Sequence, residues 1–203
     1  MIARVDDHDV GAWTIHSAAY DPAGDDWRPL PSIDIGEPAH DIAVAWTGTE
    51  LLIAPFLSNG GTRIYSLSVG DDAFIQVQSP PGEGLANRTL AWSGEELIVE
   101  YQDGSERFLA TWSPDTGSWK SVRPPRYLGG SRIVWTGDRL VFPSAGLAFD
   151  PTSETWATFD PPPGVELSGE VTLWAADRLV VWGGSAGDGA PLSRTGTLLE
   201  FDQ

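Results

Sequence analysis

The chain has 203 residues, no cysteine, and 12 lysines and arginines against 29 aspartates and glutamates, which gives a formal net charge of −17. This charge disfavours binding to nucleic-acid phosphates or to anionic lipid. The lack of cysteine excludes disulfides, thiolate metal sites and cysteine nucleophiles. Ten tryptophans with 23 glycines and 16 prolines favour many short strands joined by tight turns.

In chain order, the first recurring phrase is "YDPAGDDW" at 20–27, followed by "LSVGDDAF" at 67–74, "WSPDTGSW" at 112–119 and "FDPTSETW" at 149–156. Three copies place a tryptophan seven residues after an aromatic residue, and the second copy keeps the spacing with Leu and Phe. Asp and Pro favour a tight corner, so the phrase predicts the end of one strand, a turn, and the start of the next strand. Residues 201–202 begin a fifth copy.

A second phrase alternates with the first: "AWTGTELLI", "AWSGEELIV", "VWTGDRLVF" and "LWAADRLVV". Its tryptophans, Trp46, Trp92, Trp135 and Trp174, are 46, 43 and 39 residues apart. Each copy predicts a strand that ends in Trp, a hairpin built on a glycine in the first three copies, and a strongly apolar second strand. A repeat of this length is typical of propeller blades or solenoid turns.

Together the two phrases predict an all-β protein, a β-propeller of four-stranded antiparallel blades. The predicted single domain, 1–203, contains a partial blade at 1–31, blades at 42–81, 88–125 and 131–162, and a partial blade at 170–203. Because tryptophan recurs in every unit, we expect it to pack the seams between blades. These structural positions are Trp27, Trp46, Trp92, Trp119, Trp135, Trp156 and Trp174.

The "DP…W" corners and the double glycine of "VVWGGS", Gly183 and Gly184, resemble those of kelch and galactose-oxidase-type β-propellers. The resemblance covers nearly the whole chain and implies architecture only. Galactose oxidase chemistry needs a Tyr–Cys cross-link, and this chain has no cysteine. No cofactor is therefore expected from the resemblance.

The strand count predicts about five blades in an incomplete ring, with a tight five-bladed ring as the competing arrangement. The first unit lacks an innermost strand and the last lacks an outermost one, so the two do not complete each other. An open arc leaves apolar sheet uncovered, which predicts a covering partner, either a second copy or further blades.

The connections between strands two and three, and between blades, are longer and more varied than the hairpins on the opposite face. Binding residues concentrate on variable loops held by a rigid scaffold, so this long-loop face is the predicted binding face. We count six arginines against ten acidic residues there, and two against fourteen on the short-turn face. The predicted ligand-binding residues are Arg63, Arg88, Arg107, Arg126, Arg132 and Arg194.

Arginine presents a planar fork suited to carboxylates, so these residues could receive an acidic sugar or an acidic peptide. The structural alternative is that each pairs with a nearby acid, such as Glu106 or Glu170, and holds blade edges. The sequence contains no catalytic triad context, phosphate-binding glycine loop or H-E-x-x-H helix, so no catalytic or metal-binding residue is assigned. His8 in "DDHDV" is expected to lie in a solvated acidic terminus.

The predicted function is a non-catalytic, kelch-like propeller that binds a protein or carbohydrate through the long loops. The alternatives are a sugar-active enzyme, similar to sialidases or sialic-acid epimerases, and a truncated, inactive propeller fragment. Neither nucleic acid nor membrane is an expected partner. No apolar run of signal-peptide length is present, which predicts a cytoplasmic location, or an extracytoplasmic one if a signal peptide precedes residue 1.

Overall fold

The fold is described from a computed structural model. It describes residues 2–7, 13–57, 63–77, 79–80, 84–128, 133–163, 168–175, 177–186 and 190–200. The side chains of 2–7, 40, 84–89, 102 and 168–169 are outside this description. The candidates His8 and Arg132, and the side chain of Arg88, therefore lie outside the described part of the chain.

Five antiparallel sheets, here called blades 1 to 5 in chain order, make up the described chain. Blade 1 contains β1 (Ile2–Asp7), β2 (Trp13–Asp21), β3 (Asp26–Pro29) and β4 (Ile33–Asp34). Blade 2 contains β5 (Ala39–Trp46), β6 (Glu50–Leu57), β7 (Ile64–Ser68) and β8 (Ile75–Val77). Blade 3 contains β9 (Gly84–Trp92), β10 (Leu97–Asp103), β11 (Glu106–Ser113) and β12 (Ser118–Val122).

Blade 4 contains β13 (Val134–Trp135), β14 (Leu140–Phe142), β15 (Leu147–Asp150) and β16 (Thr155–Thr158), with a short 3-10 turn, η1 (Pro143–Ala145), after β14. Blade 5 contains β17 (Ser168–Ala175), β18 (Arg178–Ser185) and β19 (Gly196–Glu200). Among the described residues, no helix has the length and apolar character needed to cross a membrane.

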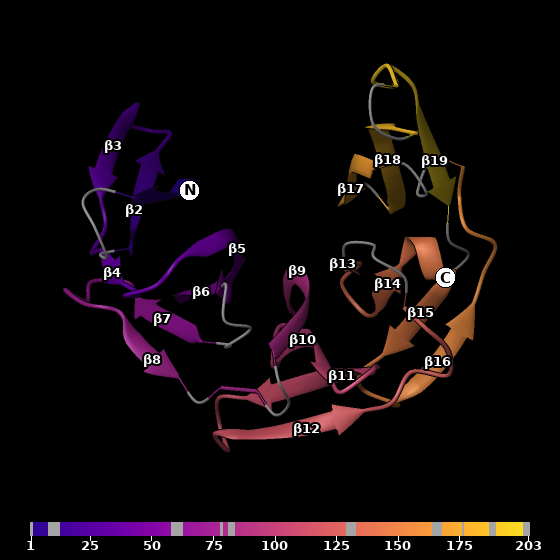
Figure 1. The fold of residues 1–203 in the computed structure, drawn as a ribbon, viewed down its shortest axis with the longest axis horizontal. Coiled ribbons are helices and arrows are strands. Elements are labelled where there is room, and N and C mark those ends of the chain that lie inside the picture. The colour runs from indigo at the N-terminus through magenta and orange to yellow at the C-terminus, as the bar shows by residue number, and fades with distance from the viewer. Residues whose placement is uncertain are drawn as a thin grey trace.

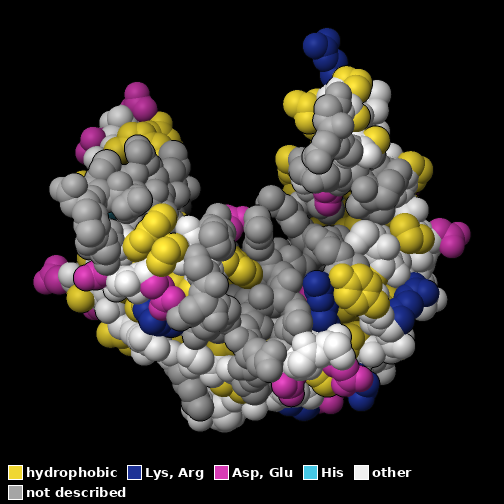
Figure 2. All heavy atoms as spheres, in the orientation of Figure 1, with side chains coloured by type: hydrophobic (Ala, Val, Ile, Leu, Met, Phe, Trp, Pro, Cys, Tyr) yellow, Lys and Arg dark blue, Asp and Glu magenta, His cyan; other side chains and the backbone are white. Residues whose placement is uncertain are grey.

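The blades stand around a central hub in the arrangement of a five-bladed β-propeller, as the repeat predicts (Figure 1). Blades 1 and 5 lie at the two ends of an arc, and the space-filling view shows an open gap between them (Figure 2). In blade 1, β3 and β4 both pair with β2, so the outermost strand is in two pieces. Blade 5 has the order β17-β18-β19, with no fourth strand among its described residues.

The aromatic corners have a direct structural explanation. The spacing of seven residues places Tyr20 opposite Trp27, Trp112 opposite Trp119, and Phe149 opposite Trp156 across neighbouring strands. Their ring centroids lie 5.0, 6.4 and 4.8 Å apart, in tilted geometry. Directly opposed aromatic pairs stabilise antiparallel strands, which explains why the spacing recurs.

Four apolar clusters fill the seams between successive blades. Ile15 and Ile33 of blade 1 pack with Leu51 and Ile53 of blade 2, and the remaining seams are built in the same way. Each sheet is therefore covered by its neighbour on both faces, except at the two ends of the arc. Sheet-on-sheet packing of this kind supplies hydrophobic stabilisation, whereas the smallest domains usually depend on disulfides or metals.

The tryptophans of the second phrase differ in how far they are buried. Trp92, Trp135 and Trp174 pack against the seam clusters. Trp46 remains 49% exposed, although we expected a seam position for it. Trp46 ends β5, the innermost strand of blade 2. In blade 1, β1 is equivalent to a second strand, and no innermost strand is described. Among the described residues, Trp46 therefore lacks the neighbouring strand that covers the equivalent tryptophans of blades 3 to 5.

Candidate functional site

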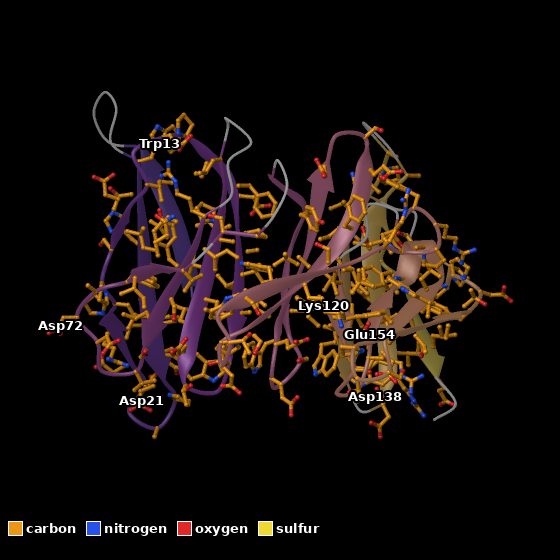
Figure 3. All side chains as sticks on the ribbon, turned by 90° about the horizontal axis from the view of Figure 1, so that it is seen from below. Trp13, Asp21, Asp72, Lys120, Asp138 and Glu154 are labelled. Carbon is orange, nitrogen blue, oxygen red and sulfur yellow. The ribbon has the colours of Figure 1, made fainter. Side chains whose placement is uncertain are left out.

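Two faces of the arc carry candidate sites. Figure 3 shows Trp13 at one end of the blades and Asp21, Asp72 and Asp138 at the other. The first end is the long-loop face, where strands two and three connect, and the second is the short-turn face. The predicted binding residues belong to the long-loop face.

At the junction of blades 3 and 4, the long-loop face contains a cluster of three residues, here called the Tyr127 cluster: Glu100, Arg107 and Tyr127. The Glu100 side chain is fully buried, and Arg107 Nη1 donates to its Oε1 across 3.1 Å. The guanidinium carbon of Arg107 lies 4.9 Å from the centre of the Tyr127 ring. Tyr127 itself is 63% exposed. An exposed ring is thereby held against a cation that is fixed from beneath.

Two further arginines, Arg123 and Arg126, belong to the connection that runs from β12 to Tyr127. Arg126 Nη2 donates to the carbonyl oxygens of Ala145 and Gly146, at 2.7 and 3.0 Å. This ties the connection between blades 3 and 4 to the η1 turn. Arg123 forms an ion pair with Glu106, and its guanidinium carbon lies 5.8 Å from the Phe108 ring centre. Figure 2 shows cationic and hydrophobic side chains next to one another over this part of the molecule.

The remaining predicted arginines lie on other blades. Arg63 Nη2 pairs with Glu37 Oε1 at 2.6 Å, and its Nη1 donates to the carbonyl oxygen of Ile35 at 2.8 Å. Arg63 thus fastens blade 2 to the connection that precedes it. Arg194 is exposed in the segment before β19. The predicted arginines whose side chains are described are therefore spread over several blades, and of these Arg107 and Arg126 lie at the junction of blades 3 and 4.

The acidic partners differ from those that the sequence suggested. The sequence suggests Glu106 and Glu170 as acids that hold blade edges, but Arg107 pairs with Glu100 and Glu106 pairs with Arg123. The connection between strands two and three of blade 3, which the sequence predicts to be long like those of the other blades, is instead a tight hairpin between Asp103 and Glu106. Gly104 at this turn has a φ of 59°, a conformation that glycine adopts without strain.

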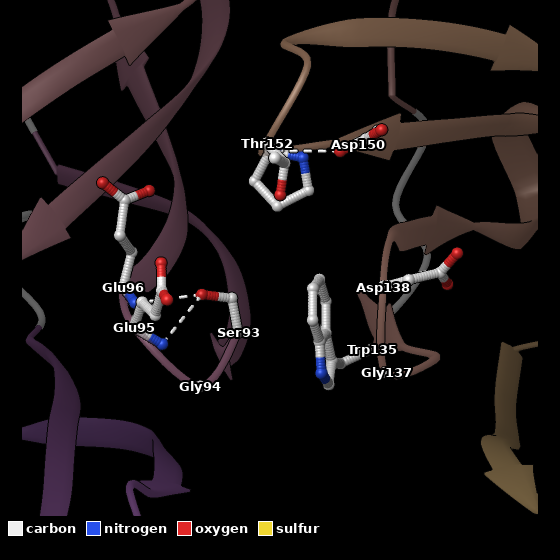
Figure 4. Close-up of a pocket in the computed structure, with 10 residues that line it drawn as sticks. Ser93, Gly94, Glu95, Glu96, Trp135, Gly137, Asp138, Asp150 and Thr152 are labelled. Atoms are coloured by element: carbon white, nitrogen blue, oxygen red, sulfur yellow. Dashed lines mark hydrogen bonds between the residues drawn. The ribbon is translucent and has the colours of Figure 1, made fainter.

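The short-turn face contains a pocket of about 750 Å³ between blades 3 and 4, which sequence reasoning did not find. Its walls are the hairpin of Gly94 and the turns near Gly137 and Pro151, with the indole of Trp135 between them (Figure 4). The pocket is lined by Ser93, Gly94, Glu95, Glu96, Trp135, Gly137, Asp138, Asp150, Pro151 and Thr152. The repeat signal was present at each turn, but only the fold shows that two successive turns face one another.

Two carboxylates of this pocket have perturbed acidity. The pKa of Asp138 is lowered because Arg139 and Thr136 donate hydrogen bonds to its carboxylate. The pKa of Asp150 is lowered chiefly because the Ser153 hydroxyl and backbone amide donate to it. Both groups are therefore held as anions near neutral pH, and the charge of Asp138 is balanced by its ion pair with Arg139. Among the described side chains, no group of three or more His, Asp or Glu could hold a metal ion.

Comparisons with known proteins bear on the fold. No protein-family model and no curated protein sequence matches the chain. A solved structure of YjhT matches with a TM-score of 0.60 and 15% identity, over 78% of this chain and 64% of that one. A crystal structure of TolB from Acinetobacter baumannii matches with a TM-score of 0.45 and 13% identity, over 98% of this chain and 42% of that one.

The chain therefore spans less than two thirds of the length of each of these solved proteins. At this level of identity, the likeness to YjhT concerns the fold and not the activity. With the five sheets and their radial order, it establishes the chain as a β-propeller.

Proposed function

We propose that the protein is a non-catalytic binding propeller of the kelch type, and that its long-loop face binds a partner at the Tyr127 cluster. The kelch-type assignment is supported by the opposed aromatic corners and by Gly183 and Gly184, whose φ values of 76° and 88° use the freedom of glycine within β18. The partner we favour is a sugar or peptide that carries a carboxylate.

The observation that carries this proposal is the geometry of the Tyr127 cluster. Burial fixes Glu100, Glu100 fixes Arg107, and Arg107 lies over an exposed Tyr127 ring. A binding surface gains affinity when its aromatic and cationic groups are already held in place before the ligand arrives. Arg126, which directly precedes Tyr127, adds positive charge to this part of a protein that is otherwise strongly acidic, and this favours an anionic ligand.

The test is a binding screen against an array of acidic and neutral glycans and a set of acidic peptides, followed by calorimetric titration of the ligands that bind. Tyr127→Ala should weaken binding about fivefold or more, because the ring contributes on the order of 1 kcal/mol. Tyr20→Ala is the matched control, since Tyr20 is an exposed tyrosine of blade 1, away from the cluster. Unchanged binding by the Tyr127 variant, or preference for cationic ligands, would refute the proposal.

A further inference from the structure

The outer face of blade 5, at the end of the arc, is a continuous apolar surface. Opposed residues on neighbouring antiparallel strands point to the same side of the sheet. Val171 lies opposite Trp182, and Leu173 lies opposite Val180. On the other side of β18, Val180 lies opposite Leu198. Four of these side chains are between 42% and 59% exposed, and Val180 is half-buried. Gly196 lies opposite Trp182, and a side chain at Gly196 would meet the indole ring. The five apolar residues Val171, Leu173, Val180, Trp182 and Leu198 are here called the blade 5 face.

Comparison with the other blades shows that this face is unusual. Leu173 directly precedes the first-strand tryptophan, Trp174. The same repeat position holds Ala45 in blade 2, Ala91 in blade 3 and Val134 in blade 4, and all three are buried. Blade 5 therefore places a leucine where blades 2 and 3 have alanine and blade 4 has valine.

The third strand shows the same substitution. Leu198 lies opposite Val180, and the corresponding residues opposite the second strand are Ser66, Thr111 and Ala148. These three small residues are buried in their blades. Leu198, in contrast, is a large side chain that faces outward.

The inner seams explain why small residues are needed. The seam of blades 3 and 4 combines Ala91 with Trp135, and the seam of blades 4 and 5 combines Ala148 with Trp174. A small residue on one sheet leaves room for the tryptophan of the next. The leucines and Trp182 remove this room from the blade 5 face, so a further blade of the same type would not fit it well.

Charge distinguishes the blade 5 face from the rest of the surface. On this side of the described strands, the charged residues are Arg178 and Glu200, which pair with each other at 2.6 Å. The face is thus neutral in a chain whose net charge is −17. Two copies of such a chain repel each other, and they can approach most closely through a neutral surface.

We propose that the blade 5 face is a homodimer interface, in which two copies meet across a twofold axis. An isologous contact brings each patch against its own equivalent, so a neutral apolar patch with one arginine and one glutamate at its rim is self-complementary. Burial of large exposed apolar side chains supplies the driving force. This interface is on blade 5 and is independent of ligand binding at the Tyr127 cluster.

The first test is sedimentation velocity of the whole chain from about 1 to 100 μM, a range that covers ordinary homodimer affinities. The wild type should form a dimer, and the double variant Leu173→Asp, Leu198→Asp should raise the dissociation constant at least about 100-fold. Ile75→Asp is the matched control, because Ile75 is 65% exposed on β8 of blade 2. A monomeric wild type at the highest concentration, or a double variant that dimerises normally, would overturn the proposal.

A second measurement keeps the test decisive if the double variant does not fold. The chain has no cysteine, so Val180→Cys introduces a single reactive thiol in the central strand of the blade 5 face. A short bis-maleimide should cross-link this variant into a covalent dimer. Ile75→Cys should give none. Failure of Val180→Cys to cross-link, or equal cross-linking of both variants, would contradict the interface.

Discussion

Arg107 donates a hydrogen bond to the fully buried carboxylate of Glu100, with 3.1 Å between Nη1 and Oε1. Glu100 occupies the repeat position eight residues after the first-strand tryptophan, where the other blades have Ala54, Pro143 and Trp182. The pairing of β9 with β10 shifts register between Val99 and Tyr101, at this same residue. Blade 3 thus has an ionic contact where its neighbours have uncharged side chains.

The first prediction concerns this contact. Glu100→Gln should lower the free energy of unfolding by about 3 kcal/mol, because it leaves Arg107 beside a buried group that no longer balances its charge. Glu106→Gln is the matched control; its partner Arg123 is exposed, and the loss should be under about 1 kcal/mol. Urea unfolding of both variants measures the difference. Equal losses would show that burial of Glu100 has no special effect.

The second prediction concerns the aromatic corners. Trp156 packs on Phe149 and Phe142, with ring centroids 4.8 and 5.7 Å away. Trp156→Ala should destabilise the fold by about 3 kcal/mol, in the range found for large aromatic deletions. Trp27→Ala, at the equivalent position of blade 1, should cost less, because Trp27 is about half exposed. Thermal unfolding compares the two variants, and a larger loss for Trp27 would contradict this ranking.

The third prediction concerns Gly146, which ends the η1 turn with a φ of 59°. A Cβ at this position would meet the carbonyl oxygen of Phe159 and the ring of Pro161. Gly146→Ala should therefore destabilise the protein by about 2 kcal/mol or more, through backbone strain and a steric clash together. Gly117→Ala separates the two effects, since Gly117 has a similar φ of 63° but has open space around it. Equal losses would mean that strain alone is responsible.

The fourth prediction concerns pH. The pKa of Asp150 is lowered in the folded protein, mainly by donation from Ser153. A lowered pKa contributes stability that is present above the unfolded value of about 3.9 and is lost as the pH falls through the folded value. Asp150→Asn should therefore be less stable than the wild type at pH 6, and the difference should shrink toward pH 3. A difference that is constant over this range would contradict the assignment.

Much of the fold could be predicted from the sequence because its signals are local and repeated. The corner phrase predicts a tight turn between strands three and four, with its two aromatic residues opposed. Tyr20 and Trp27 are opposed in this way in the structure. The hairpin glycines Gly48, Gly94 and Gly137 all have positive φ, as primed turns demand. Such features depend on neighbours in the chain and not on the arrangement of distant blades.

The sites were harder to predict because they depend on contacts between blades. Nothing in the spacing of residues 100 and 107 showed that this glutamate would be buried and paired, since the same repeat position is apolar elsewhere. Trp46 carries the same signal as Trp92, yet it is about half exposed, because burial depends on the neighbouring blade. The short-turn pocket arises only when the turns of blades 3 and 4 are brought together.

The open arc is the central claim, and a spin-label distance measurement across its gap tests it most directly. The chain has no cysteine, so His16→Cys on blade 1 and Thr197→Cys on blade 5 give one label at each end. Mixing the doubly labelled protein with an excess of unlabelled protein ensures that the measured distance is between two labels on the same chain. An open arc predicts a distance of more than about 20 Å, twice the ~10 Å spacing of packed sheets. A sharp distribution near the packed-sheet spacing would show that the ring closes.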